Sequence, residues 1–246
     1  MSGHSKWATI KHAKGAADAK RGQMFTKLIK EISIAARMGG GNPEGNPRLR
    51  TAILKARGAN MPKDNIDRAI KKGTGELEGV NYEELTYEAY APGGVAVLIE
   101  VLTDNKNRAA ADVRNILTRA GGQLATAGSV SRLFKRQGIV TLDGEKYTED
   151  QVMEAAIDGG AEDVSLSNGI IEVTSAPEDF EAVLNALNAK DFETMSAEVS
   201  MVAESEIALD NEGTAKAVRL IDRLEENDDV QNVYSNIEIP EDFEAE

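Results

Sequence analysis

The hydrophobic pattern of this chain changes its period near residue 73, and that change limits the folds it can adopt. Before this point, large apolar residues recur at helical spacing, as at Phe25, Leu28 and Ile32. Beyond residue 84, β-branched runs such as Val95–Thr103 alternate with helical segments. The stretch Gly73–Glu84 between them is acidic, rich in glycine and without period. We therefore expect a helical N-terminal part, a linker, and a mixed α+β part.

Turn and cap residues divide the N-terminal part into three helices. The run Gly39-Gly40-Gly41 ends the first helix, because glycine enters the left-handed region without a Cβ penalty. Asn46-Pro47 supplies a cap and a first residue for the second helix, and Pro62 opens the third, which runs to Gly73. We expect the outward faces to carry the basic residues Lys27, Lys30, Arg37, Arg48, Arg50, Lys55, Arg57, Arg68, Lys71 and Lys72.

A complete unit can be read between residues 135 and 206. Thr148-x-x-Gln151 has the pattern of a capping box, and Asn168-Gly169 is a strong hairpin signal. Ser175-x-x-Glu178 predicts the start of a second helix in this unit. The resulting order, βαββαβ, is typical of a ferredoxin-like domain.

The segments on either side of this unit look like two halves of another one. Strand Val95–Thr103 and the predicted strand Val230–Ile239 have no other partners nearby in the sequence. We therefore predict an α+β fold with an N-terminal three-helix domain and two ferredoxin-like α+β domains, one inserted in the other. The expected domains are residues 1–75, residues 80–134 with 207–240, and the inserted residues 135–206.

Charge is distributed very unevenly along the chain. Residues 1–72 hold 16 Lys and Arg against 5 Asp and Glu, although the whole chain holds 28 against 42. The other 174 residues therefore hold 12 basic and 37 acidic side chains. A basic segment on an acidic body indicates binding to a polyanion, and clustered basic residues supply the sequence-independent part of nucleic-acid binding.

The first 23 residues form a basic arm with too few apolar side chains to fold alone, and we expect it to be mobile or laid along the body. Its cations are Lys6, Lys11, Lys14, Lys20 and Arg21. Trp7 either buries its ring against the body or stacks on a base, and packing is the commoner use of a lone aromatic residue.

The chain lacks the parts of the usual catalytic sites. It has no cysteine, and its two histidines, His4 and His12, both lie in the arm, so neither a zinc site nor a Ser-His-Asp triad is expected. The spacing Gly73-x-Gly75-x-x-x-Gly79 follows a helix instead of a strand, and we interpret it as linker. We expect no enzymatic activity, metal, cofactor or small-molecule substrate.

The loop Asp104–Arg108 has two interpretations. Asp104 or Asn107 could cap the following helix, or Lys106 and Arg108 could bind phosphate beside the helix N-terminus. Both can hold together.

The longest aliphatic run, Val95–Ile99, is too short to span a bilayer, and the first 20 residues contain no secretory signal pattern. We expect a cytoplasmic protein. No coiled coil or other dimerisation segment occurs, so we expect a monomer.

Several motifs together resemble the YebC family. They are Gly3-His4-Ser5-Lys6-Trp7, Asp18-Ala19-Lys20-Arg21-Gly22, Phe25-Thr26-Lys27-Leu28-Ile29, Asn46-Pro47-Arg48-Leu49-Arg50, Asn60-Met61-Pro62-Lys63-Asp64, Tyr87–Gly94, Thr103–Arg108 and Gly128-Ser129-Val130. The resemblance covers nearly the whole chain. It implies a helical domain, two α+β domains around a cleft, and no enzymatic activity.

The resemblance implies a regulatory function but leaves its target open. Family members are generally labelled probable transcriptional regulators with DNA binding, while others are ribosome-associated translation factors that relieve stalls at consecutive prolines. In our reading, Asp64 and Asp67 would repel phosphate from the third helix, and Asn60-Met61 is shorter than a helix-turn-helix turn. We keep DNA as the first interpretation and ribosomal RNA as the alternative. The expected binding residues are Lys6, Trp7, Lys11, His12, Lys14, Lys20, Arg21, Lys27, Lys106 and Arg108.

Overall fold

The computed structural model describes residues 18–167, 169–240 and 243. Its described residues form two compact units, which are considered separately. One unit holds residues 18–127 and 216–233, and the other holds residues 128–215 and 234–240 with residue 243. The domain boundaries predicted from the sequence remain a prediction.

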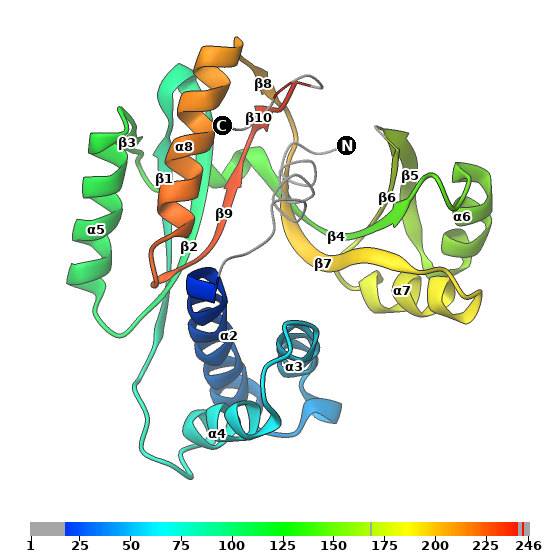
Figure 1. Ribbon diagram of the computed structural model, residues 1–246, viewed down its shortest axis with the longest axis horizontal. Helices are drawn as coiled ribbons and strands as arrows, with labels where there is room; N and C mark the ends of the chain where they lie inside the picture. Colours follow the sequence, from blue (N-terminus) through cyan, green and yellow to red (C-terminus); the bar gives the residue numbers. More distant parts are fainter. Residues whose placement is uncertain (1–17, 168, 241–242, 244–246) are drawn as a thin grey trace. The chain divides into compact units, whose positions relative to one another are not determined.

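The helices and strands follow each other in mixed order (Figure 1). The α-helices are α2 (Asp18–Gly39), α3 (Pro47–Gly58), α4 (Lys63–Thr74), α5 (Lys106–Arg119), α6 (Glu149–Ala156), α7 (Phe180–Ala189) and α8 (Asn211–Glu225). The strands are β1 (Glu83–Tyr90), β2 (Ala96–Thr103), β3 (Gln123–Leu124), β4 (Phe134–Asp143), β5 (Ala161–Ser167), β6 (Ile170–Ser175), β7 (Thr194–Ala203), β8 (Ile207–Ala208), β9 (Val230–Ser235) and β10 (Ile237–Glu238). The fold class is α+β, as predicted.

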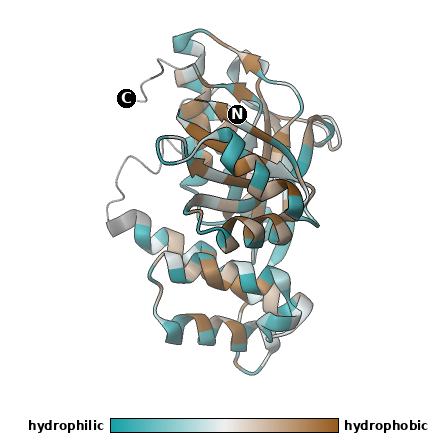
Figure 2. Cartoon of the chain, turned by 90° about the vertical axis from the view of Figure 1, so that its right-hand side faces the viewer, coloured by the Kyte–Doolittle hydropathy of each residue, from teal (hydrophilic) through white to brown (hydrophobic). Residues whose placement is uncertain are grey.

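Helices α2, α3 and α4 form a bundle around a shared apolar core. Ile32 of α2, Leu49 of α3 and Ile66 of α4 are all buried in it. Hydrophobic residues recur along each helix between hydrophilic ones (Figure 2). The predicted cap of α3 is confirmed, because Asn46 Oδ1 accepts a hydrogen bond from Leu49 N at 3.1 Å.

Helix α2 begins six residues earlier than the sequence pattern predicted. It starts at Asp18, so residues 18–23 belong to the helix and not to the arm. These residues include good helix formers, and an acidic residue at a helix start interacts favourably with the dipole. The side-chain amide of Gln23 also donates to the backbone carbonyl of Glu226. A tertiary contact that the sequence does not reveal therefore supports the first turns of α2.

Glycine at position 73 allows α4 to approach α2 very closely. A Cβ on Gly73 would lie 2.2 Å from the carbonyl oxygen of Ser33 and 2.9 Å from Cβ of Ala36. Ser33 Oγ donates to Ala69 O at 3.1 Å across the same contact. Gly73 is thus a packing residue at the crossing of two helices.

The first sheet has the strand order β3-β1-β2-β9. Strands β1 and β2 are antiparallel, with Ala89 opposite Val97. Helices α5 and α8 meet β1 at Gly122, where a Cβ would lie 2.8 Å from Leu220 Cδ1 and 2.9 Å from Tyr90 O. Because β9 pairs with β2, the predicted joining of the two separated halves in one sheet is confirmed.

The second sheet has the order β5-β6-β4-β7, and its elements follow the predicted βαββαβ sequence. Helices α6 and α7 cover one face, where Leu142, Ile171 and Leu187 are fully buried. The capping box at Thr148 and Gln151 is present as predicted. Chain order places this ferredoxin-like unit between α5 and α8, which makes it an insertion.

Two element boundaries predicted from the sequence were wrong. Ser175 ends strand β6 instead of capping a helix, because it is buried opposite Gly138, and α7 starts only at Phe180. The predicted strand Val230–Ile239 is broken at Asn236, since its last part pairs with β8 in a separate two-stranded sheet.

The close approach at Gly73 predicts a large effect of a single methyl group. Gly73→Ala should lower the free energy of unfolding by about 1–3 kcal/mol, because the added Cβ overlaps the Ser33 carbonyl. Gly22→Ala is the matched control: this helical glycine has open space around it, so alanine should raise stability by up to about 1 kcal/mol. Urea unfolding midpoints of the two variants would test this, and equal midpoints would contradict it.

Candidate nucleic-acid interface

The helical bundle exposes cations that no described residue neutralises. Within the described part of the chain, no ion pair involves any of six exposed basic residues of the bundle, which are Arg37, Arg57, Lys63, Arg68, Lys71 and Lys72. Asp64 and Asp67 are also exposed on α4. We call the six residues the free cations.

Half of the binding residues predicted from the sequence belong to the segment that precedes α2. Lys6, Trp7, Lys11, His12 and Lys14 lie outside the described residues. Lys20 and Arg21 fall in the first turn of α2, and the Arg21 side chain is exposed.

Lys27 is half-buried and interacts with the end of another helix. Its Nζ donates to the backbone carbonyl of Glu225, the last residue of α8, at 2.6 Å. The last carbonyls of a helix carry partial negative charge, so a lysine there is stabilising. The structure therefore gives Lys27 a role in packing α2 against α8.

Lys30 is buried, contrary to the prediction that it lies on the outer face. Only 7 % of the residue is exposed, and its Nζ lies 2.7 Å from Asp229 Oδ1, 2.8 Å from Asp228 O and 3.4 Å from Leu102 O. An ammonium group has three donors, so these three acceptors match its capacity. The same Nζ lies 5.7 Å from the ring centroid of Tyr82.

Asp229 collects partners from three other segments. Its Oδ1 accepts from Lys30, while its Oδ2 accepts from Thr103 Oγ1 at 3.0 Å and from Arg108 Nη2 at 2.8 Å. Burial alone would raise the pKa of Asp229, but the hydrogen bonds from Lys30 and Arg108 outweigh it and lower the pKa below its usual value. We call Lys30, Thr103, Arg108 and Asp229 the joint.

The joint connects the helical bundle to the first sheet. Lys30 belongs to α2, Thr103 ends β2, and Asp229 immediately precedes β9. Arg48 of α3 adds a second connection, because it pairs with Glu31 of α2 and Glu84 of β1. The predicted outward position of Lys30 was therefore wrong, whereas the side chain of Arg48 stays 37 % exposed while it pairs with Glu31 and Glu84.

The loop before α5 is a capped helix start whose cations have partners. Asn105, and not the predicted Asp104 or Asn107, is the cap, and its Oδ1 accepts from Arg108 N at 3.0 Å. Lys106 Nζ lies 2.5 Å from Glu83 Oε2, and Arg108 bonds to Asp104 as well as Asp229. These two cations stay predicted binding residues, but any phosphate would compete with carboxylates for them.

The connection between α3 and α4 is longer than the sequence suggested. It comprises Ala59–Pro62, which is four residues, since α3 ends at Gly58 and α4 begins at Lys63. This length is that of a helix-turn-helix turn, so the argument from a short connection was wrong. The exposed carboxylates of Asp64 and Asp67 still oppose insertion of α4 into a groove.

Sequence reasoning missed the joint. Asp229 stands in the acidic run Asn227-Asp228-Asp229, where nothing distinguishes it from other surface carboxylates. The part of the chain that the structure describes contains no cluster of His, Asp and Glu suited to hold a metal. Among the same residues, no helix has the length and hydropathy to cross a membrane.

The α+β fold combines a basic helical bundle with two four-stranded sheets. Residues 5–76 match the family described as "TACO1/YebC protein N-terminal domain". Residues 82–237 match the family described as "TACO1/YebC second and third domain". The chain belongs to the TACO1/YebC family.

Relatives cover the chain from end to end. A protein of Treponema denticola is 68 % identical over 99 % of both chains, and one of Borrelia garinii is 56 % identical over 99 % of this chain and 100 % of its own. Both are named probable transcriptional regulatory proteins. The crystal structure of a conserved hypothetical protein from Aquifex aeolicus is 46 % identical, with a TM-score of 0.82 over 92 % of this chain and 93 % of that one.

Removal of the buried charge at the joint should be strongly destabilising. Asp229→Asn leaves the Lys30 ammonium buried without a counter-charge, which should cost about 3–5 kcal/mol of unfolding free energy. Glu193→Gln removes an exposed partner of Lys146 and should leave the unfolding midpoint unchanged.

The loss caused by Asp229→Asn should also depend on pH. The folded-state pKa of Asp229 is lowered, so its contribution is fully present above the unfolded-state pKa of about 3.9. As pH falls through the lower folded-state pKa, the carboxylate becomes protonated and resembles the Asn variant. Urea unfolding at neutral and acid pH should show the two proteins converging in acid. A difference that persists or grows in acid would contradict this assignment.

Proposed function

We propose that this chain is a non-enzymatic regulatory protein that binds nucleic acid through its basic N-terminal part. The observation that carries this proposal is the division of charge. The described bundle exposes six free cations, whereas the chain beyond residue 72 is strongly acidic. Phosphate neutralisation by Lys and Arg supplies most sequence-independent affinity for nucleic acids.

The names of the relatives support DNA as the first partner, since both describe transcriptional regulation. Ribosomal RNA is the second candidate, because one observation opposes insertion of α4 into a regular duplex groove. Asp64 in the first turn of α4 and Asp67 three residues later would face the phosphates of a groove. A binding mode outside a regular duplex groove avoids that repulsion.

In this proposal, the arm and the free cations contact phosphates together. Lys6, Lys11, Lys14, Lys20 and Arg21 are the first contacts, with Trp7 and His12 beside them. Lys27, Lys106 and Arg108 contribute to the local potential while keeping their intramolecular partners. No cofactor is needed for this function.

Neutralising the arm should change the salt dependence of binding. If Lys6, Lys11 and Lys14 each neutralise one phosphate, converting all three to Gln should reduce the slope of log K against log salt by about 2 for single strands and about 2.7 for duplex. Titrations would use a DNA duplex, a single strand of the same sequence and a hairpin RNA. The matched control converts Lys135, Lys146 and Lys190 of the ferredoxin-like unit to Gln, and it should leave the slope unchanged. Equal slopes for the arm variant and the unaltered chain would show that the arm does not contact phosphate.

The arm variants should retain their stability if residues 1–17 alone are altered. Residues 18–23 are excluded from this test, because they form part of α2 and Gln23 contacts Glu226.

Trp7→Ala separates the two roles open to this side chain. If Trp7 stacks on a base, the variant should lose about 1–3 kcal/mol of binding free energy with an unchanged salt slope. If Trp7 packs against the body, the free protein should instead be cleaved faster by trypsin near Lys11 and Lys14. If the variant shows neither weaker binding nor faster cleavage, both roles are ruled out.

A further inference from the structure

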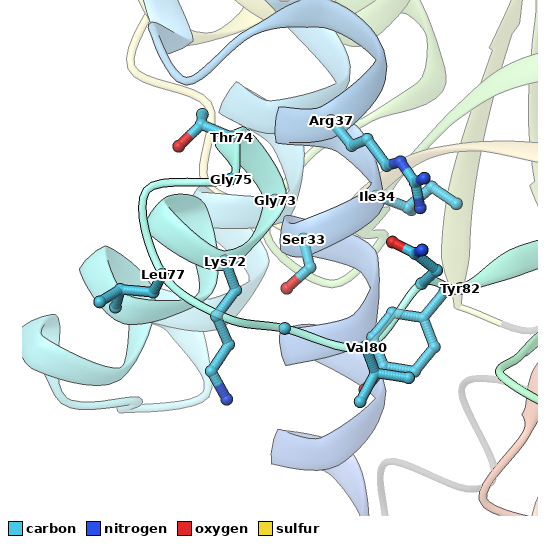
Figure 3. Close-up of a pocket in the computed structure, with 12 residues that line it drawn as sticks. Ser33, Ile34, Arg37, Lys72, Gly73, Thr74, Gly75, Leu77, Val80 and Tyr82 are labelled. Atoms are coloured by element: carbon cyan, nitrogen blue, oxygen red, sulfur yellow. The ribbon is translucent and has the colours of Figure 1, made fainter.

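A cavity of about 250 Å³ opens between α2, the end of α4 and the following segment 75–82 (Figure 3). Ser33 and Ile34 of α2 lie along one wall, and both are buried. Leu77 and Val80 of the segment are exposed at 43 % and 54 %. The cavity therefore has an ordered wall on one side and an exposed apolar rim on the other.

Three glycines shape this cavity, and they are the ones that the sequence pattern assigned to a simple linker. Gly73 allows α4 to contact the Ser33 carbonyl, and Gly75 reverses the chain with a φ of 84°. A Cβ on Gly79 would lie 3.0 Å from Lys72 Cβ, so the segment returns against α4. Leu77 N donates to Lys71 O at 3.1 Å and fixes the turn. The glycine spacing thus builds a defined wall.

Two free cations, Arg37 and Lys72, line the cavity. Figure 3 shows their side chains at different ends of it, with the ring of Tyr82 beside Val80 at the end of the returning segment. No carboxylate belongs to the lining. The nearby Glu76 accepts from Thr74 Oγ1 at 2.9 Å, which holds its carboxylate at the helix end.

Tyr82 supplies an aromatic part of the same lining. Its ring is half-buried, and burial together with the charges of Asp104 and Asp229 raises the pKa of its hydroxyl, so the ring is neutral at pH 7. An aromatic ring and cations in one cavity can together bind an unstacked base and its phosphates. The Tyr82 ring also lies near Lys30 of the joint, so the cavity is adjacent to the contact between the helical bundle and the first sheet.

We propose that this cavity receives one unstacked nucleotide of a single-stranded or looped nucleic acid. The base lies against Tyr82, and the phosphates on its two sides interact with Arg37 and Lys72. This inference rests on the proposed nucleic-acid binding and names the form of nucleic acid recognised. A base within a regular duplex is stacked and paired, so it cannot enter without being extruded.

The test measures binding of a short oligouridylate and a matched oligothymidylate to the full chain. Tyr82→Leu removes the aromatic face and should weaken both about fivefold to a hundredfold, whereas Tyr82→Phe keeps the face and should bind like the unaltered chain. Binding of a DNA duplex should change much less in Tyr82→Leu.

Lys72→Gln tests the charged end without disturbing the joint, because Lys72 is exposed. It should lower the salt slope for the oligouridylate by about 0.7. Lys190→Gln is the control, because this exposed lysine lies outside the cavity and is not one of the free cations, and it should leave the slope unchanged. Equal effects of the two substitutions would mean that the cavity has no special share in binding.

Two further outcomes distinguish failure of the cavity proposal from failure of the proposed nucleic-acid binding. If the full chain binds none of these nucleic acids, the proposed function itself fails. If it binds them and neither Tyr82→Leu nor Lys72→Gln has an effect, only the cavity proposal fails. Uridine monophosphate is the probe for a free-nucleotide site. Binding as tight as that of the oligouridylate would overturn recognition of a strand, while much weaker binding supports it.

Discussion

The ion pair between Lys30 and Asp229 is the interaction on which the arrangement of the helical bundle and the first sheet depends. Burying either charge alone would be unfavourable by several kcal/mol, so each is tolerated only because the other is present. Thr103 and Arg108 complete the set of hydrogen bonds to Asp229. The joint therefore requires α2, β2 and the turn before β9 to be in place together, which makes it selective for one arrangement.

The joint also explains how the basic residues divide. Lys27, Lys30, Arg48 and Arg108 interact with carbonyls or carboxylates of the protein itself, and they hold the bundle in position. The free cations on α2, α3 and α4 have no such duty among the described residues. A count of charges in the sequence does not distinguish these two groups of basic residues. A basic segment thus contributes fewer available cations to nucleic-acid binding than its sequence suggests.

In the segment after α4, the same glycines serve both packing and the formation of the cavity beside Tyr82. Glycines that permit a tight helix crossing and a chain reversal also leave space between α2 and the returning segment. Because Lys30 contacts Tyr82, a ligand at this ring would lie next to the group that attaches the bundle. Binding and domain attachment are therefore adjacent in the structure.

The features that depend on neighbouring residues could be predicted from the sequence alone. The cap at Asn46, the capping box at Thr148 and the βαββαβ order all follow from local hydrogen bonds and local periodicity. The division of charge and the family motifs could also be recognised in the sequence. The burial of Lys30 could not be predicted in this way, because its partner Asp229 lies 199 positions away and looks in the sequence like any other surface aspartate. The early start of α2, the break at Asn236 and the cavity formed by Gly73, Gly75 and Gly79 likewise depend on contacts between segments, which hydrophobic period and turn chemistry do not encode.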